Sequence, residues 1–300
     1  MSNKPFVTTL PSSLAPSLKR GLRDKGFTLS QPEYTEFCGK KKGVSCTLYR
    51  SGKLVVSGKE KEDFIRFWLE PEILGTFTYG YKEELAPIDT TPRIGIDESG
   101  KGDFFGPLCI AGVYADASQI TKLAELGVKD SKNMSDKAIR ALAKKIRPCC
   151  THHFIRVNPL KYNELYVKFN NLNTFLAWGH ASTIEELVQR SGCDNVLIDQ
   201  FAARHVVENA LLKKKLRVQL KQRHRAEEDT VVAAASILAR DAFLEGMEKL
   251  SDQLGIQLPK GASAKVQQIG RQIVAKHGPD MLRRVAKTHF KTYKIIVQEM

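Results

Sequence analysis

The sequence from residue 94 to residue 103 is Ile94-Gly95-Ile96-Asp97-Glu98-Ser99-Gly100-Lys101-Gly102-Asp103. Its short apolar run, which indicates a buried strand, leads directly into two adjacent acids and a Gly-Lys-Gly turn. Acidic side chains at the end of a strand lie where α/β sheets usually bind ligands. A lone Asp-Glu pair is most often a solvated turn, so its interpretation depends on what else the chain supplies.

Further acids occur at two other element boundaries. Asp199 ends the apolar run Val196-Leu197-Ile198, and Glu227-Glu228-Asp229 precedes an Ala-rich helical stretch that begins at Val231. Crowded carboxylates stay ionised only when a cation compensates them, and Mg²⁺ is the usual cation in phosphate chemistry. Two such ions, about 3.5–4 Å apart, can clamp the attacking water and the leaving oxygen of a phosphodiester. For the triplet at 227–229, an alternative is the capped start of a helix.

Two nucleotide-binding motifs nearly match the same residues, and we reject both. Gly95-x4-Gly100-Lys101 resembles a P-loop, but Gly102 stands where Mg²⁺ binding needs Ser or Thr. Gly100-x-Gly102 begins a dinucleotide-binding fingerprint, but the third glycine, Gly106, falls one residue late.

The 300 residues, 42 % of them hydrophobic, are enough for two domains with real cores. A proline-containing, weakly periodic stretch at 83–93 predicts a linker, 85–92, between a domain at 1–84 and a domain at 93–300. The second domain mixes strands and helices, which predicts an α/β fold with a central sheet covered by helices. Strands are expected at 93–97, 108–114, 151–157 and 196–199, and helices at 135–147, 172–190 and 231–250, followed by basic helices.

The first domain is expected to be a small basic α+β module. Its pattern predicts a helix at 12–25, a hairpin at 43–58 with its turn at Ser51-Gly52, and an amphipathic helix at 60–73. Lys40-Lys41-Lys42 precedes the hairpin. These lysines fit either a solvated loop or a sheet that faces nucleic acid.

A formal net charge of +14 indicates a polyanionic partner, which could be nucleic acid, an anionic membrane or an acidic protein. Membrane is the weakest of these, because no apolar run approaches the ~20 residues of a spanning helix. The six cysteines form no Cys-x-x-Cys pair, and the start of the chain lacks the apolar core of a signal peptide. Both features favour a reducing compartment, and we expect a cytoplasmic protein.

The eleven residues from Asp97 to Pro107 resemble the opening motif of the type 2 ribonucleases H, and specifically the ribonuclease HIII family, which has Gly-Lys-Gly where ribonuclease HII typically has Gly-Arg-Gly. Further segments that look familial are 128–132, 197–201, 233–240 and 285–292, so the likeness spans roughly residues 93–292. Residues 47–69 resemble one repeat of the TATA-binding-protein fold, which is what likeness to ribonuclease HIII predicts for the N-terminal domain.

The resemblance implies a ribonuclease H-like mixed sheet and endonucleolytic cutting of the RNA strand in RNA/DNA hybrids, with 5′-phosphate and 3′-hydroxyl ends. It implies Mg²⁺ or Mn²⁺ held by an Asp-Glu-Asp-Glu set, of which Asp97, Glu98 and Asp199 are the first three. Glu227 fits the fourth position. Glu228 and Asp229 stay open, because this chain is one residue shorter between that acid and the helix.

In this hypothesis Asp97 bridges the two metal ions, and the other three acids complete their ligand sets. Gly100 and Gly102 let the backbone approach the substrate closely, and Lys101 lies near the scissile phosphate or the 2′-hydroxyl. We expect a monomer. The alternative is a non-catalytic nucleic-acid-binding protein on a degenerate nuclease fold, which would leave a labelled hybrid intact.

Overall fold

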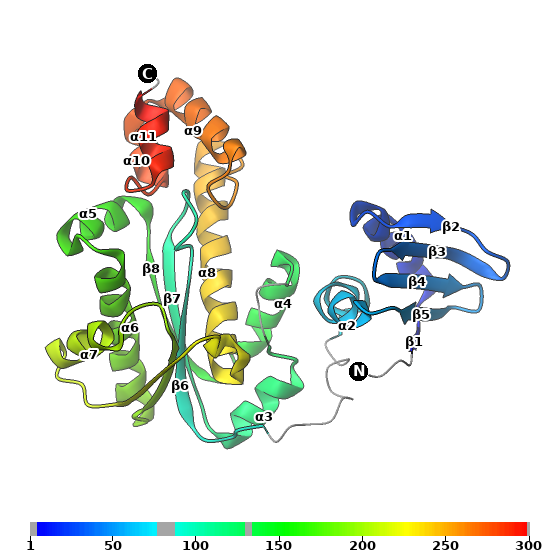
Figure 1. Cartoon of the computed structure of the whole chain (residues 1–300), viewed down its shortest axis with the longest axis horizontal. Helices are drawn as coiled ribbons and strands as arrows, with labels where there is room; N and C mark the ends of the chain where they lie inside the picture. The colour runs from blue at the N-terminus through cyan, green and yellow to red at the C-terminus, as the bar shows by residue number, and fades with distance from the viewer. Residues whose placement is uncertain (1–4, 77–87, 130–133, 299–300) are drawn as a thin grey trace. The chain divides into compact units, whose positions relative to one another are not determined.

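The computed structural model describes residues 5–76, 88–129 and 134–298. The chain divides into two compact units (Figure 1). The N-terminal unit comprises Met1–Ala86 and Asn133–Ala141, and the C-terminal unit comprises Pro87–Lys132 and Leu142–Met300. Part of the predicted linker lies outside the described residues, so the domain boundaries stay a prediction.

The N-terminal unit contains a five-stranded antiparallel sheet in the order β1-β5-β4-β3-β2. Its strands are β1 (Phe6–Thr9), β2 (Thr28–Ser30), β3 (Thr35–Lys41), β4 (Val44–Tyr49) and β5 (Lys53–Ser57). β4 and β5 confirm the predicted hairpin, and Gly52 supplies the positive φ of 80° that its turn requires. Lys40 and Lys41 belong to the exposed end of β3, and Lys42 begins the turn that follows.

Helices pack against this sheet and form an apolar core with it. They are η1 (Ser12–Leu14), α1 (Ala15–Asp24), α2 (Lys61–Phe64) and η2 (Ile65–Leu74). Leu18, Leu22 and Leu69 pack with strand residues in one apolar cluster. The predicted helix at 60–73 is confirmed in extent, but from Ile65 onward it is wound as a wider π-helix. Pro71 lies inside this segment and has no N–H to donate to the usual α-helical hydrogen bond.

The C-terminal unit is built on a mixed five-stranded sheet in the order β10-β9-β6-β7-β8. Its strands are β6 (Arg93–Ser99), β7 (Leu108–Ala115), β8 (Thr151–Val157), β9 (Asn195–Asp199) and β10 (Gln219–Arg223). β6, β7 and β8 pair antiparallel, whereas β6, β9 and β10 run parallel. The carboxyl ends of three parallel strands therefore meet at one edge.

Helices lie on both faces of this sheet, with α6 and α8 on opposite sides (Figure 1). The helices are α3 (Ala117–Glu125), α5 (Pro159–Phe169), α6 (Leu172–Ser191), α7 (Arg204–Lys213), η4 (Ala226–Glu228), α8 (Thr230–Leu254), α9 (Ala264–His277), α10 (Pro279–Val285) and α11 (Lys291–Gln298). Helix α4 (Asp136–Ile146) is divided at Ala141 between the two units. The predicted helices at 135–147, 172–190 and 231–250 are confirmed as α4, α6 and α8. α3, α5 and α7 were not predicted. Across the described residues, no helix combines the length and apolar character needed to cross a membrane.

Close packing of α8 against β6 sets which way the strand's side chains point. A Cβ on Gly95 would lie 2.6 Å from the backbone nitrogen of Val232, so only glycine lets the helix approach this closely. Ile94 and Ile96 face the other way, into the apolar core that contains α6 residues. Because side chains alternate along a strand, Asp97 falls on the α8 side of the sheet and Glu98 on the α6 side.

Candidate active site

An acidic cleft of about 430 Å³ opens at the carboxyl ends of the parallel strands. Its lining residues are Asp97, Glu98, Ser99, Asp103, Asp199, Glu227, Ser236, Arg240, Phe243 and Lys260. The structure thus brings the four predicted acids, Asp97, Glu98, Asp199 and Glu227, into one cleft from three different elements. Their catalytic roles stay a prediction.

Asp97 is held by its own strand and by α8. Its Oδ1 accepts a hydrogen bond from the backbone nitrogen of Glu98 at 2.8 Å, and the side chain of Ser236 hydrogen-bonds to the carboxylate. Burial, followed by repulsion from Glu98, raises the pKa of Asp97 to about 7. A carboxylate in this state gains strongly from a nearby cation.

Glu98 is held by two side-chain partners. Its Oε2 lies 3.0 Å from Nε2 of His180, a fully buried residue of α6, and its Oε1 lies 3.5 Å from Nζ of Lys101. Burial works to raise the pKa of Glu98, but the hydrogen bond from His180 and the charge of Lys101 outweigh it and lower the pKa. The two adjacent acids therefore differ in protonation, with Glu98 the more firmly ionised.

Asp199 and Glu227 arrive from the next two strands. In the parallel register of β6 and β9, Ile96 pairs with Ile198, so the next residues along the two strands, Asp97 and Asp199, lie side by side. Asp199 Oδ1 accepts a hydrogen bond from the backbone nitrogen of Ala226 at 3.1 Å, which ties it to the short turn that carries Glu227. Glu227 is 7 % exposed, whereas the neighbouring Glu228 is exposed and does not line the cleft.

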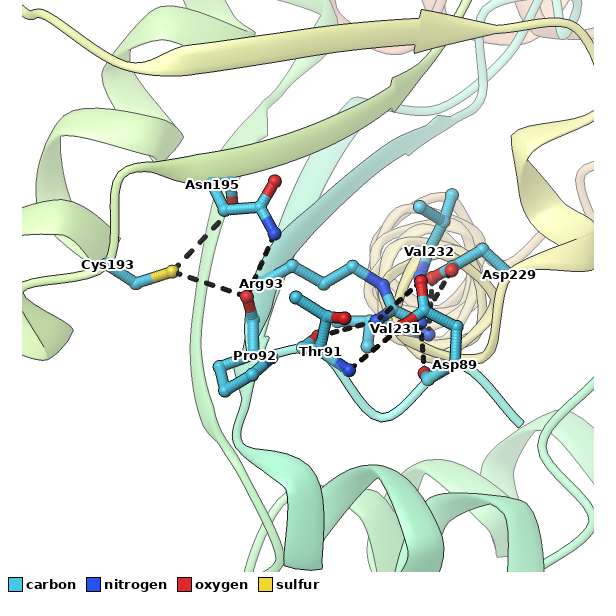
Figure 2. Close-up of polar contacts among 9 residues, drawn as sticks. All are labelled: Asp89, Thr91, Pro92, Arg93, Cys193, Asn195, Asp229, Val231 and Val232. Carbon is cyan, nitrogen blue, oxygen red and sulfur yellow. Dashed lines mark hydrogen bonds and ion pairs between the residues drawn. The ribbon is translucent and has the colours of Figure 1, made fainter. Parts of the chain in front are cut away.

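Asp229 has a different, structural position at the start of α8. Its Oδ1 accepts hydrogen bonds from the backbone nitrogens of Val231 and Val232, as the predicted helix cap requires. Its Oδ2 lies 2.7 Å from the guanidinium of Arg93, which also donates to the backbone oxygens of Asp89 and Thr91 (Figure 2). This geometry separates Asp229 from the cleft and favours Glu227 as the fourth acid.

The Gly-Lys-Gly turn lies between two residues that line the cleft, Ser99 and Asp103. Gly100 has φ +87°, and a Cβ there would lie 2.2 Å from the backbone oxygen of Pro107 and 2.8 Å from the Phe243 ring, so glycine is required. A Cβ on Gly102 would meet nothing within 4 Å, which leaves this exposed backbone open to a large ligand. Lys101 is 39 % exposed and lies over the Phe201 ring at 5.9 Å.

The chemistry of the cleft fits a hard divalent cation, because its acids supply oxygen ligands and one of them has a raised pKa. Yet nowhere in the described parts of the chain are three His, Cys, Asp or Glu side chains already placed around a common point to hold a metal. In this arrangement one oxygen of Glu98 is engaged by His180, and one oxygen of Asp199 accepts from the backbone nitrogen of Ala226.

The sequence did not predict several residues at the site, among them His180, Phe201, Arg240 and Lys260. His180 carried a usable signal, because it lies four residues from both Leu176 and Ile184 on the buried stripe of α6. An ionisable residue in an apolar stripe needs a partner. Phe201 packs its ring 4.6 Å from that of His180, but an aromatic residue after a strand has no distinctive pattern.

Comparison with known families defines the class of protein first. Residues 94–293 match the family model described as Ribonuclease HII, so the sheet and cleft are those of a type 2 ribonuclease H. Residues 5–78 match a model described as a domain of unknown function, DUF3378.

Relatives and solved structures narrow this further. Ribonuclease HIII of Protochlamydia amoebophila is 57 % identical over 98 % of this chain and 97 % of the relative, and that of Chlamydia pneumoniae is 52 % identical over 96 % and 97 %. The crystal structure of Bst-RNase HIII in complex with Mn²⁺ aligns with a TM-score of 0.67 at 31 % identity and covers 99 % of both chains. The chain belongs to the ribonuclease HIII family. This membership supports endoribonuclease activity on RNA/DNA hybrids.

Proposed function

We propose that this chain hydrolyses the RNA strand of RNA/DNA hybrids in the acidic cleft, using Asp97, Glu98, Asp199 and Glu227. The observation that supports the assignment is that these four acids meet in one cleft at the carboxyl ends of the parallel strands. Two of them come from β6, one from β9 and one from η4, which follows β10. The resemblance to ribonuclease HIII supplies the substrate class and the 5′-phosphate and 3′-hydroxyl products.

The four acids would hold Mg²⁺ or Mn²⁺, and the Bst-RNase HIII crystal structure contains Mn²⁺. When bound, such ions supply a nucleophilic water at neutral pH and stabilise the leaving oxygen. Asp97 lies between Glu98 on its own strand and Asp199 on the neighbouring strand, which suits it to a bridging role. Its raised pKa predicts that a proton leaves Asp97 when a cation enters.

The chain's own residues would orient the substrate. Lys101 lies 3.5 Å from Glu98 and is partly exposed, so its ammonium can reach a phosphate oxygen or a 2′-hydroxyl at the mouth of the cleft. Gly102 presents bare backbone beside it. His180 holds one oxygen of Glu98 from within the core, which fixes the direction of that carboxylate.

The N-terminal unit would bind the hybrid. Its sheet carries Lys40 and Lys41 at the exposed end of β3, and Lys42 follows them. Exposed lysines of this kind can neutralise backbone phosphates of a nucleic acid. We propose residues 1–84 as a TATA-binding-protein-like substrate-binding domain joined by a linker at 85–92 to the catalytic domain at 93–300. We also propose a monomer that works in the cytoplasm.

The test is incubation of the protein with an end-labelled RNA/DNA duplex and Mg²⁺ or Mn²⁺, beside a duplex that contains a single ribonucleotide. Asp97→Asn should abolish cleavage, while Asp252→Asn, an exposed acid at the far end of α8, should leave it unchanged. An intact hybrid in the presence of wild-type protein would favour the non-catalytic binding protein instead. Full activity in Asp97→Asn would refute the carboxylate assignment.

A further inference from the structure

The C-terminal segment 285–288 lies directly against the loop that follows the Gly-Lys-Gly turn. Gly106 donates its backbone N–H to Val285 O at 3.0 Å, and Lys287 donates its own to Phe104 O at 2.9 Å. Phe105 and Ala286 form an isolated antiparallel bridge. Residues about 180 positions apart are thus joined by backbone pairing next to the cleft residue Asp103.

Lys287 adds a side-chain contact of an unusual kind to this pairing. It is fully buried, and its Nζ lies 2.8 Å from the backbone oxygen of Asp103, 2.8 Å from that of Gly106 and 3.5 Å from that of Phe105. Burial lowers the pKa of Lys287 to about 7. Three carbonyl acceptors nevertheless suit an ammonium, which has three N–H bonds, better than a neutral amine, which has two.

The loop that Lys287 holds is connected to the site at both ends. Asp103 lines the cleft, and its Oδ1 accepts a hydrogen bond from the backbone nitrogen of Gly261, next to the cleft residue Lys260. The backbone nitrogen of Asp103 donates to Gly100 O at 3.3 Å and so closes the turn that presents Lys101. A displacement of residues 103–106 would therefore move the turn and two cleft residues together.

The tail segment has its own anchor, so it is a fixed point for the loop. Asn163 of α5 donates from Nδ2 to Arg283 O and Ala286 O, both at 3.0 Å. Its Oδ1 accepts from the backbone nitrogen of Thr288 at 3.0 Å and from the Thr288 hydroxyl at 3.2 Å. The amide of Asn163 thus fixes the chain on both sides of Lys287.

We propose that Lys287 is a positioning residue for the substrate: it clamps the backbone of residues 103–106 from the C-terminal segment and so holds the Gly100-Lys101-Gly102 turn in its substrate-binding position. The proposal rests on the proposed function, because it takes this cleft as the place where the hybrid binds. Without the clamp, the loop would occupy its binding conformation only part of the time, and apparent affinity falls by that fraction. Substrate at saturation would restore the loop, so the loss appears in KM.

Lys287→Met tests this, because it keeps the length and most of the volume of the side chain and removes only the ammonium. Ile296→Ala is the matched control, since Ile296 is buried in α11 of the same C-terminal region, where its Cδ1 lies against Gly270 of α9. We expect Lys287→Met to raise KM for the hybrid about tenfold and to leave kcat within about twofold. The control should change neither.

Amide hydrogen exchange gives a readout that does not depend on cleavage. In Lys287→Met, exchange should accelerate about tenfold or more in the peptide that covers residues 100–107 and stay unchanged in α9. If Lys287→Met does not fold, Asn163→Ala loosens the same anchor with Lys287 intact and should raise KM in the same direction.

Localised exchange together with a raised KM supports the proposal. Four results would each overturn it: unchanged exchange in the loop, a uniform rise in exchange throughout the C-terminal unit, a normal KM, or a loss confined to kcat. If wild-type protein fails to cut the hybrid, the proposed function fails, and the exchange experiment alone still decides whether Lys287 holds the loop.

Discussion

Replacement of Asp97 by Asn should inactivate the enzyme and at the same time stabilise its metal-free form. Asn keeps the size of the side chain and an Oδ1 that can accept from the Glu98 backbone nitrogen, as Asp97 does at 2.8 Å. It removes the negative charge that burial and Glu98 disfavour. The substitution is thus expected to lower activity and raise stability, whereas a general folding defect would lower both.

The magnitude follows from the pKa of Asp97, which is raised from its ordinary 3.8 to about 7. At about 1.4 kcal/mol per pKa unit, the charged form costs up to roughly 4 kcal/mol in the folded protein. Asp97 and Glu98 titrate together, so we expect about 2–4 kcal/mol for the single substitution. Between about pH 4 and 7 the folded protein retains a proton that the unfolded chain has released. The stability of the metal-free wild type therefore falls as the pH rises through that window.

The assay is urea unfolding of wild type, Asp97→Asn and the exposed-site control Asp252→Asn, with chelator or with excess Mg²⁺, at pH 5 and pH 8. A Trp68→Phe background leaves Trp178 as the single tryptophan, which reports on the C-terminal unit alone. With chelator at pH 8, Asp97→Asn should be the more stable protein, and its advantage should shrink to less than half at pH 5. Mg²⁺ should stabilise wild type far more than the variant. If Asp97→Asn is no more stable than wild type at pH 8 without metal, the electrostatic account of this site is wrong.

Four further predictions concern the fourth acid, the helix cap at Asp229, the metal and the N-terminal unit. Glu227→Gln should lower kcat at least ~100-fold, while Glu228→Gln should remain within about twofold of wild type; equal losses in both would remove the assignment of Glu227. Asp229→Asn should cost about 1–3 kcal/mol of stability through loss of the Arg93 ion pair, because Asn can still cap the helix, with hybrid cleavage retained below the unfolding temperature. Chelation should stop cleavage and added Mg²⁺ or Mn²⁺ should restore it, which a metal-independent nuclease would not show. Replacement of Lys40, Lys41 and Lys42 by Gln should reduce the slope of log KM against log salt by as much as ~2, and an unchanged slope would mean that these lysines do not contact phosphates.

The central part of the fold could be predicted because its elements have clear periodicity. α6 and α8 are long, and β6 and β9 are apolar runs that end in acids. β10, with the sequence Gln-Leu-Lys-Gln-Arg, was missed because an edge strand with one buried residue lacks an apolar pattern. α7 was missed because its Arg, Glu and Lys residues dilute the apolar face.

The candidate site was predictable as a set of acids but not in its choice of the fourth. From the sequence, Glu227, Glu228 and Asp229 are three similar acids before a helix. In three dimensions, they differ by what lies next to them: the cleft for Glu227, exposed surface for Glu228, and two backbone N–H groups with Arg93 for Asp229. Such differences depend on a strand more than 130 residues earlier, which no local pattern encodes.

Close contact between α8 and β6 limits how such chains can vary in length. The helix meets the strand at Asp229–Arg93, Val232–Gly95, Ser236–Asp97 and Phe243–Gly100 in turn. One residue inserted between Asp229 and Ser236 would rotate everything beyond it by about 100° and turn Ser236 away from Asp97. Insertions and deletions in related genes should therefore accumulate before Asp229, in the turn from β10, and be purged inside the first two turns of α8. The same limit applies to loops grafted onto this scaffold: they can be inserted before Asp229 but not within the first two turns of α8.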